Sequence, residues 1–278
     1  MQKSEPRCIA WLASFPKSGN TWVRVLLANY LINADAPVSI NELSRIALGD
    51  SLEKFYKRHD PSFDPKDELK AVQLRETMLR GLIGNPNDLH FLKTHSINSK
   101  IEGIDLIPPG LTRTAIYIVR NPLDVLVSYA DHYGLEIEQA AQAMCSIYNR
   151  VVAHEGNVTQ YLGSWSGHVQ FWTRASAFPV HVVRYEHILQ NPYKAFRTIL
   201  LRLSLKIDKA RIEKAVEFSS FDTLKKQESE SGFIERSKKS TTFFRSGKSE
   251  AWRDVVTDEI QSLFRKEHGR IMKKYKYL

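Results

Sequence analysis

The chain has 278 residues, of which 42% are hydrophobic and 26% charged, a composition that suits a globular protein with a real core. Its net charge of +9 favours acidic partners and fits nucleic acid as well as a small, highly charged anion. No apolar run of about 18 residues occurs, so we expect no membrane span. Two cysteines, Cys8 and Cys145, are too few for a disulfide framework and indicate core thiols in a reducing cytoplasm.

Strands and helices alternate along the predicted chain. In order, we expect a strand at 8–13, a helix over 23–31, a short helical piece at 40–48, a helix at 66–82, strands at 89–93 and 114–119, a helix capped by Asn121, helices at 137–152 and 165–177, a strand at 180–184, a helix at 192–203 and a last helix capped by Thr257. This alternation predicts one α/β domain, residues 1–278, in which helices flank a central, mostly parallel sheet.

The segment 15–22 joins the first predicted strand to the first predicted helix. A strand, a turn containing Gly19 and a helix start point backbone N–H groups and a helix dipole at an anion. Lys17 adds a mobile positive charge, and Ser18 and Thr21 add hydroxyl donors. We interpret the segment as a P-loop-like phosphate cradle, although a solvated helix start also fits. It is not a Walker A loop, because Lys17 precedes the glycine.

Polar and aromatic side chains follow the other predicted strands as well. Lys93 and His95 end the second strand, Arg120 follows the third and Tyr185 follows the fourth. Ligands of parallel α/β sheets bind beyond the carboxyl ends of the strands, so these residues should meet. Each alone could be a loop or core residue. Arg120 stands where a nucleotide triphosphatase would carry a magnesium-binding Asp, so we expect protein cations, and no metal, to hold the anion.

Several motifs resemble those of the cytosolic-type sulfotransferases, in the order of that family. The segment 15–22 resembles their 5′-phosphosulfate loop, 93–95 their catalytic Lys-x-His, and 117–129 their 3′-phosphate motif. Weaker matches lie at 184–186, 219–221, 244–247 and 252–253. The stretches 11–24, 163–165 and 184–186 look more like bacterial natural-product sulfotransferases than animal ones.

The resemblance implies transfer of a sulfuryl group from 3′-phosphoadenosine 5′-phosphosulfate (PAPS) to an acceptor hydroxyl or amine, leaving adenosine 3′,5′-bisphosphate (PAP). His95 would be the general base, Lys93 would stabilise the transferring group, and Lys17 would act on the bridging oxygen. The transfer would be in-line and without a metal. The donor-binding residues it implies are Lys17, Ser18, Gly19, Asn20, Thr21, Trp22, Arg120, Ser128, Tyr185, Phe221, Arg245, Ser246 and Gly247.

Two other functions stay open at this stage: a P-loop-type ATP-dependent kinase, and a non-catalytic protein that binds polyanions. For the enzyme we expect a small-molecule acceptor, no nucleic acid, and mobile acceptor-side segments at 36–65 and 228–249. The family's dimer motif is not recognisable near Thr257, which leaves a homo-oligomer open. Seven aromatic residues could line the acceptor pocket or simply pack: Phe55, Tyr56, Phe63, Tyr133, Phe233, Phe243 and Phe244.

Overall fold

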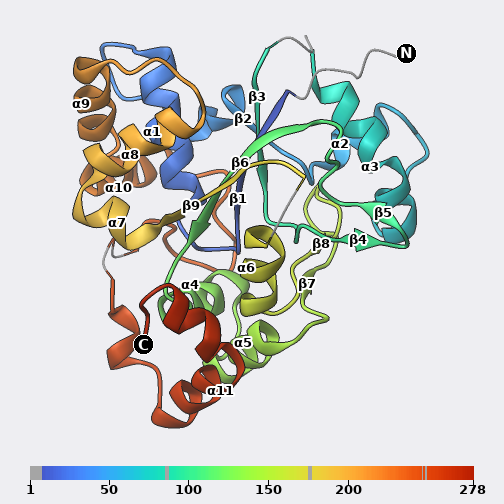
Figure 1. Cartoon of the computed structure of the whole chain (residues 1–278), viewed down its shortest axis with the longest axis vertical. Coiled ribbons are helices and arrows are strands. Elements are labelled where there is room, and N and C mark those ends of the chain that lie inside the picture. Colours follow the sequence, from blue (N-terminus) through green and yellow to red (C-terminus); the bar gives the residue numbers. More distant parts are fainter. Residues whose placement is uncertain (1–7, 85–87, 175–176, 246, 248) are drawn as a thin grey trace.

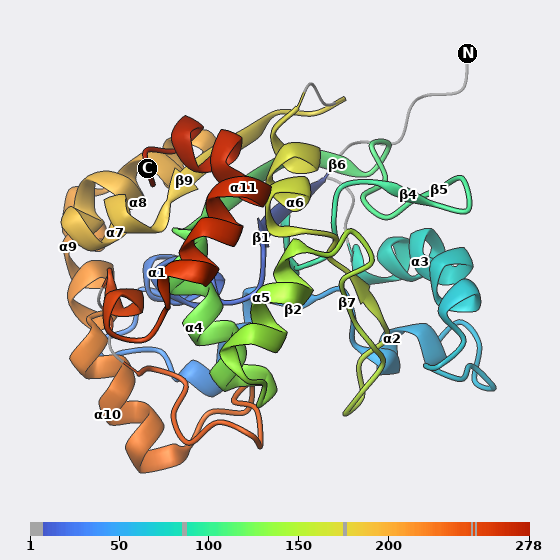
Figure 2. The same cartoon turned by 90° about the horizontal axis from the view of Figure 1, so that it is seen from below.

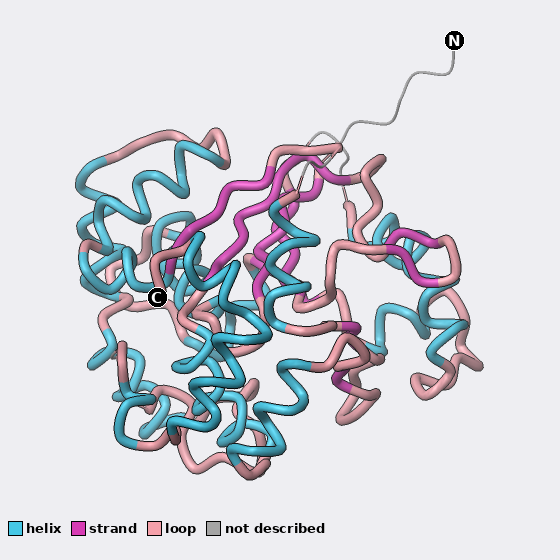
Figure 3. The backbone as a smooth tube through the Cα atoms, turned by 60° about the horizontal axis from the view of Figure 1, so that its bottom comes forward, coloured by secondary structure: helices cyan, strands magenta, loops and turns pink. Residues whose placement is uncertain are grey.

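The computed structural model describes residues 8–84, 88–174, 177–245, 247 and 249–278. Within them, five strands form one sheet in which every pair of neighbours is parallel. Helices surround this sheet (Figures 1 and 3). The order across the sheet is β2 (Ala47–Gly49), β3 (His90–Thr94), β1 (Ile9–Ser14), β6 (Thr112–Val119) and β9 (Val180–Arg184). The predicted α/β class with a flanked parallel sheet is confirmed.

Alternate side chains of the central strand β1 enter two separate cores. Ile9 and Trp11 face one core, while Ala10 and Leu12 face the other, and all are buried. Burial on both faces explains why β1 is an unbroken apolar run. The first core is closed by α3 (Glu68–Leu82), α4 (Pro122–Tyr133), α5 (Ile137–Cys145), α6 (Trp165–Thr173) and α11 (Asp258–Lys274), and the second by α1 (Asn20–Ile32), α7 (Tyr185–Gln190), α8 (Pro192–Arg202) and α9 (Lys209–Phe218).

Helix starts agree well with the sequence. The Asn121 side chain accepts a hydrogen bond from the Leu123 amide at 3.0 Å, with Pro122 at the first helical position of α4. Thr257 caps α11 by accepting from the Ile260 amide at 3.5 Å. These caps depend on chemistry within one turn, and both predictions are confirmed.

Three predicted helices are wrong in extent. The piece at 40–48 is a short 3₁₀ helix, η1 (Ile40–Arg45), followed by strand β2, which pairs with β3. The helix at 137–152 ends at Cys145, and the chain then forms β7 (Arg150–Val151), which pairs with β8 (Gln160–Tyr161). The helix at 165–177 ends at Thr173. In the first case, pairing with the distant strand β3 overrides the local helical pattern, and in the second the pairing of β7 with the nearby β8 does.

Other elements lie at the edges of the fold. The predicted segment 36–65 contains η1, β2 and a short helix, α2 (Glu53–Lys57). The segment 228–249 begins inside α10 (Phe221–Ser231), so its first residues are helical. Residues 232–245, which we call the strap, then run from α10 toward α4 (Figure 2). A two-stranded piece, β4 (Lys100–Ile101) with β5 (Ile104–Asp105), and η2 (Ala251–Asp254) complete the elements of the described residues.

A buried ion pair joins the end of β2 to α3. The Arg75 guanidinium donates to the Asp50 carboxylate, to the Leu106 carbonyl oxygen and, at 3.4 Å, to the Tyr56 hydroxyl. The side chains of Arg75 and Asp50 are 5% and 2% exposed. Because an isolated buried charge is costly, each partner needs the other.

We therefore expect Asp50→Asn to lower the free energy of unfolding by about 3–5 kcal/mol, because it leaves the Arg75 charge buried without a counter-ion. Urea unfolding followed by circular dichroism measures this change. Glu76→Gln is the matched control, since Glu76 pairs with Arg80 at the surface, where such pairs add little. Equal midpoints for the two variants would contradict the prediction.

Candidate active site

A cavity of about 1140 Å³ lies beyond the carboxyl ends of the strands. The residues that follow β1, β3, β6 and β9 meet there, as the sequence predicts. Of the predicted site residues, those lining the cavity are Lys17, Gly19, Asn20, Thr21, Trp22, Lys93, His95, Arg120, Ser128, Tyr185, Phe221, Arg245 and Gly247. The Ser18 side chain is buried away from the lining, and its hydroxyl has no hydrogen-bond partner in the described chain. Ser246 lies outside the described residues.

The loop after β1 has the shape expected of a phosphate cradle. Lys17 and Gly19 both adopt left-handed backbone angles, with φ of +65° and +102°. The side-chain Nδ2 of Asn20 donates to the Leu12 carbonyl oxygen at 2.8 Å and so holds the loop against β1. A Cβ atom on Gly19 would lie 2.5 Å from the Tyr185 ring. The loop therefore needs glycine at this position for its backbone angle and for the close approach of the ring.

Arg120 joins the phosphate loop to the end of β9. Its guanidinium donates to the Lys17 carbonyl oxygen at 3.1 Å and lies 4.4 Å from the centroid of the Tyr185 ring. Trp22 meets the same ring edge-on, with centroids 5.8 Å apart, and its indole N–H donates to the Ser219 carbonyl at 2.8 Å. These rings and this cation form one wall of the cavity.

Gly247 brings the C-terminal part of the chain to this wall. Its φ is +59°, and a Cβ atom there would lie 2.5 Å from the Phe221 ring. The exposed Arg245 lies two residues earlier and also lines the cavity. Phe244, Arg245 and Gly247 therefore all lie at the cavity.

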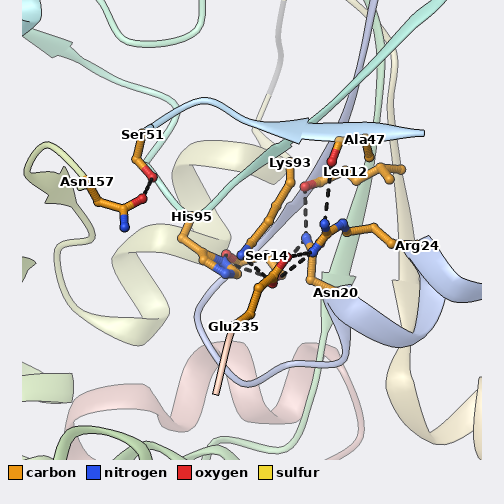
Figure 4. Close-up of polar contacts among 10 residues, drawn as sticks. All are labelled: Leu12, Ser14, Asn20, Arg24, Ala47, Ser51, Lys93, His95, Asn157 and Glu235. Atoms are coloured by element: carbon orange, nitrogen blue, oxygen red, sulfur yellow. Dashed lines mark hydrogen bonds and ion pairs between the residues drawn. The ribbon is translucent and has the colours of Figure 1, made fainter. Parts of the chain in front are cut away.

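His95 has a defined tautomer. Its Nδ1 lies 2.8 Å from the Ser14 carbonyl oxygen and 3.3 Å from the Ser14 hydroxyl (Figure 4). A carbonyl can only accept, so Nδ1 carries the proton and Nε2 carries the lone pair. Burial, together with the nearby Lys93 charge, lowers the pKa of His95 well below its usual value. The imidazole is therefore neutral at neutral pH and able to accept a proton.

The backbone around His95 is held by buried side chains that the sequence reasoning did not identify. His168 donates from Nε2 to the His95 carbonyl at 3.0 Å, and its Nδ1 accepts from the Tyr117 hydroxyl at 2.8 Å. The Trp172 indole donates to the Ser96 carbonyl at 3.0 Å. These contacts come from α6, about 70 residues further along the chain.

Lys93 is held by a carboxylate that the sequence analysis also missed. Its ammonium lies 3.1 Å from Oε2 of Glu235 in the strap, and Arg24 of α1 contacts both Glu235 oxygens, at 2.8 and 2.9 Å. Burial raises the pKa of the Glu235 carboxyl, but Lys93 and Arg24 outweigh it and lower the pKa to about 2. Glu235 is thus ionised at neutral pH. No sequence periodicity links these three residues, so only the fold shows the cluster.

Among the described residues, the Lys17 ammonium makes no ion pair within 4 Å, although the carboxylates of Asp131 and Glu228 act on it from further away. The ammonium lies 3.8 Å above the centroid of the Phe243 ring. Burial lowers the pKa of Lys17 to about 7; Asp131 opposes this shift, while Arg120 and Lys93 add to it. A buried ammonium destabilised in this way gains from a bound anion, which fits a phosphate group.

The rest of the cavity is lined by aromatic and apolar side chains and also by charged ones such as Arg150, Glu155 and Lys238. Tyr133, Phe243 and Phe244 line it, as considered from the sequence, together with Tyr129 and Val151. The remaining aromatic candidates, Phe55, Tyr56, Phe63 and Phe233, are buried in the cores instead, where Tyr56 and Phe63 stack at 5.4 Å.

The described residues contain no group of three or more histidine, cysteine or acidic side chains able to hold a metal ion. Nor do they contain a helix that combines the length and apolar character needed to cross a membrane.

Comparison with known proteins shows the family. The model of the sulfotransferase domain matches residues 9–276. Sulfotransferase 1B1 of the dog, Canis lupus familiaris, is 25% identical over 272 residues, which cover 92% of this chain and 82% of the relative. Sulfotransferase 1 family member D1 of the mouse, Mus musculus, is 24% identical over 270 residues, covering 94% and 82%. These relatives are mammalian, so they do not support the expected bacterial origin.

Solved structures show the same fold. A retinol dehydratase in complex with androsterone and the inactive cofactor PAP gives a TM-score of 0.66 at 19% identity, covering 96% of this chain and 81% of the other. The mouse sulfotransferase SULT7A1 complexed with PAP gives 0.59 at 20% identity, covering 97% and 90%.

The chain therefore belongs to the sulfotransferase domain family, as the motifs predict. It is a PAPS-dependent sulfotransferase, with PAPS as the sulfuryl donor.

The close approach of Tyr185 to Gly19 gives a test of the cradle. We expect Gly19→Ala to weaken PAP binding and to destabilise the fold by about 1–3 kcal/mol, since the new methyl group displaces the ring and strains the backbone. Calorimetric titration with PAP and thermal unfolding measure the two effects. Gly103→Ala is the matched control, because Gly103 has a similar φ of +78° but no atom within 4 Å of the added Cβ. Unchanged PAP affinity in Gly19→Ala would contradict this view of the loop.

Proposed function

We propose that His95 is the general base of sulfuryl transfer and that the acceptor is a hydroxyl or amine of a small molecule. In this mechanism Nε2 of His95 takes the acceptor's proton as the acceptor oxygen or nitrogen forms a bond to sulfur. The bond between sulfur and the bridging oxygen of PAPS breaks, and its electron pair stays on the 5′-phosphate. The products are PAP, the sulfated acceptor and a protonated His95, which then loses its proton to solvent.

The observation that carries this proposal is the hydrogen bond from His95 Nδ1 to the Ser14 carbonyl. This hydrogen bond places the proton of the neutral imidazole on Nδ1, so Nε2 has the lone pair that can accept the acceptor's proton. A neutral histidine within reach of a reacting hydroxyl is an effective base. His95, Lys93 and Lys17 line one cavity, which supports a single site where the acceptor loses its proton and receives the sulfuryl group.

For the donor, we propose roles that follow the charge that develops in the reaction. Lys17 neutralises the bridging oxygen and the 5′-phosphate, and its stabilising effect is greatest in the transition state, when that oxygen gains charge. Lys93 neutralises the transferring group. The remaining contacts are the loop at 18–22 for the 5′-phosphate, Arg120, Ser128 and residues 245–247 for the 3′-phosphate, and Trp22, Tyr185 and Phe221 for the adenine. Because protein cations supply the neutralising charge, we propose an in-line transfer that needs no metal.

The two alternatives from the sequence are weaker. The family match and Arg120 at the end of β6 argue against an ATP-dependent kinase. An imidazole with a defined tautomer inside the cavity favours a catalyst over a simple binder of polyanions.

Several finer points remain proposals. The aromatic and apolar part of the cavity supports an acceptor with an apolar body, and the strap and the segment 36–65 are the proposed acceptor walls. A panel of phenols, steroids, sugars and peptidic natural products assayed with labelled PAPS would identify the acceptor class. Cys8 and Cys145 form no disulfide in the described chain, which supports a cytoplasmic location. A homo-oligomer and the boundaries of the domain stay predictions.

We expect His95→Gln to lower kcat by about 10²–10⁴-fold with the best acceptor of that panel, because the general base is lost. The affinity for PAP, measured by calorimetry, should stay within about twofold, since the base acts on the acceptor. His181→Gln is the matched control, because His181 lies in β9 outside the cavity lining. A His95→Gln variant with normal turnover would refute the proposed base.

The pKa of Lys17 predicts that PAP binding takes up a proton. In the free protein Lys17 loses its proton as the pH rises through about 7, whereas bound phosphate favours the ammonium and raises its pKa. Near pH 8, binding should therefore take up close to one proton, and above pH 7 affinity should fall by at most about tenfold per pH unit. Calorimetry in buffers of different ionisation enthalpy measures the uptake. Lys17→Arg stays charged and should abolish it; undiminished uptake in this variant would contradict the assignment.

A further inference from the structure

Glu235 brings a carboxylate to two cations of the cavity, Arg24 and Lys93. Figure 4 shows it pointing between Arg24 and Lys93, next to Ser14 and His95. Its side chain is 28% exposed, whereas that of Arg24 is 2% exposed and that of Lys93 is 22% exposed. Glu235 of the strap thus contacts Arg24 of α1 and Lys93 of β3.

The charges of this cluster do not cancel. Two cations and one carboxylate leave one net positive charge beside His95. A lysine ammonium has three N–H donors, of which Glu235 takes one, so two remain for another anion. Glu235 can therefore hold Lys93 without using up its ability to bind the transferring group.

The strap has other attachments that do not involve Lys93. Asn41 of η1 accepts from the Ile234 amide at 2.9 Å and donates to the Gly232 carbonyl at 3.2 Å. Further along, the Ser240 hydroxyl donates to Asp131 at 2.6 Å. The pairing of Glu235 with Lys93 is thus additional to what fixes the course of the strap.

From this geometry we propose that Glu235 is a positioning residue for sulfuryl transfer: together with Arg24, its carboxylate holds the Lys93 ammonium at the end of β3, beside His95. The inference rests on the role proposed above for Lys93. Lysine has a flexible four-carbon stem, and without a fixed partner its ammonium samples many positions. A group that must meet the transferring sulfuryl oxygen in the transition state gains from being held before the donor binds.

The alternative is that Glu235 inhibits donor binding, and the two roles predict different changes in kcat and KM. If the carboxylate instead occupied the place of the sulfuryl group, it would compete with PAPS for Lys93. Its removal would then lower the KM for PAPS and leave kcat equal or higher. A positioning role predicts a lower kcat with PAP affinity preserved.

The test is a double-mutant cycle of Glu235→Gln and Lys93→Met, assayed with PAPS and the best acceptor of the panel. Glu235→Gln should lower kcat by about tenfold to a hundredfold and leave the affinity for PAP within about twofold. In the Lys93→Met background the same change should lower kcat by less than about twofold, because Glu235 acts through Lys93. Glu235→Asp keeps the charge beside Arg24 and should fall between the wild type and Glu235→Gln, which guards against loss of folding.

Asn41→Ala is the matched control, because it frees the strap near Glu235 without removing a charge. A loss of kcat in Asn41→Ala as large as that in Glu235→Gln would overturn the inference, as would a lower KM for PAPS with undiminished kcat. If Lys93→Met lowers kcat, and Glu235→Gln then lowers it further by the same factor as in the wild type, only the role of Glu235 is overturned. Normal kcat in Lys93→Met refutes the role proposed for Lys93, and the present inference with it.

Discussion

The hydrogen bond from His95 to the carbonyl of Ser14 is the contact on which the rest of the site depends. It joins the ends of two neighbouring parallel strands, whose register pairs Ala13 with Thr94 and so places the next residues of both strands side by side. Because the acceptor is a backbone carbonyl, the imidazole has a defined tautomer, and its orientation follows the sheet itself. The phosphate loop begins directly after Ser14, so the sheet holds both the proposed base and the phosphate cradle in place.

Electrostatics around this contact prepare the cavity for an anion. Lys17, Lys93 and Arg120 stand close together, and burial lowers the pKa of Lys17 to about 7. Such a cluster is unfavourable when empty and favourable when phosphate groups neutralise it. The Glu235 carboxylate contacts both Lys93 and Arg24. It neutralises only one of these two charges, so the cluster keeps a positive charge. The free protein therefore carries the charge arrangement that its donor requires.

The proposed donor and acceptor sides differ in how they are built. The proposed donor wall comes from strand ends, the start of α1 and rings packed against the glycine backbones at Gly19 and Gly247. The proposed acceptor side comes from the strap and the segment 36–65, and the strap is attached to α4 by the contact of Ser240 with Asp131. A constant donor calls for a rigid wall, whereas acceptor selection can vary with loops on the same sheet. This difference explains why the sequence indicated the donor but not the acceptor.

The sequence by itself determined the features that arise within one strand, one turn or one helix: the buried strands, the caps at Asn121 and Thr257, and the polar and aromatic residues at the strand ends. Parallel topology then brought Lys17, Lys93, His95 and Arg120 to one edge without further information. Only the tertiary structure decided that residues 47–49 form an edge strand, because their partner strand β3 lies far along the chain. It also decided that α5 ends at Cys145, after which β7 pairs with the nearby β8. It alone also decided that His168 supports His95 and that Glu235 pairs with Lys93, since such contacts leave no periodic trace in the sequence.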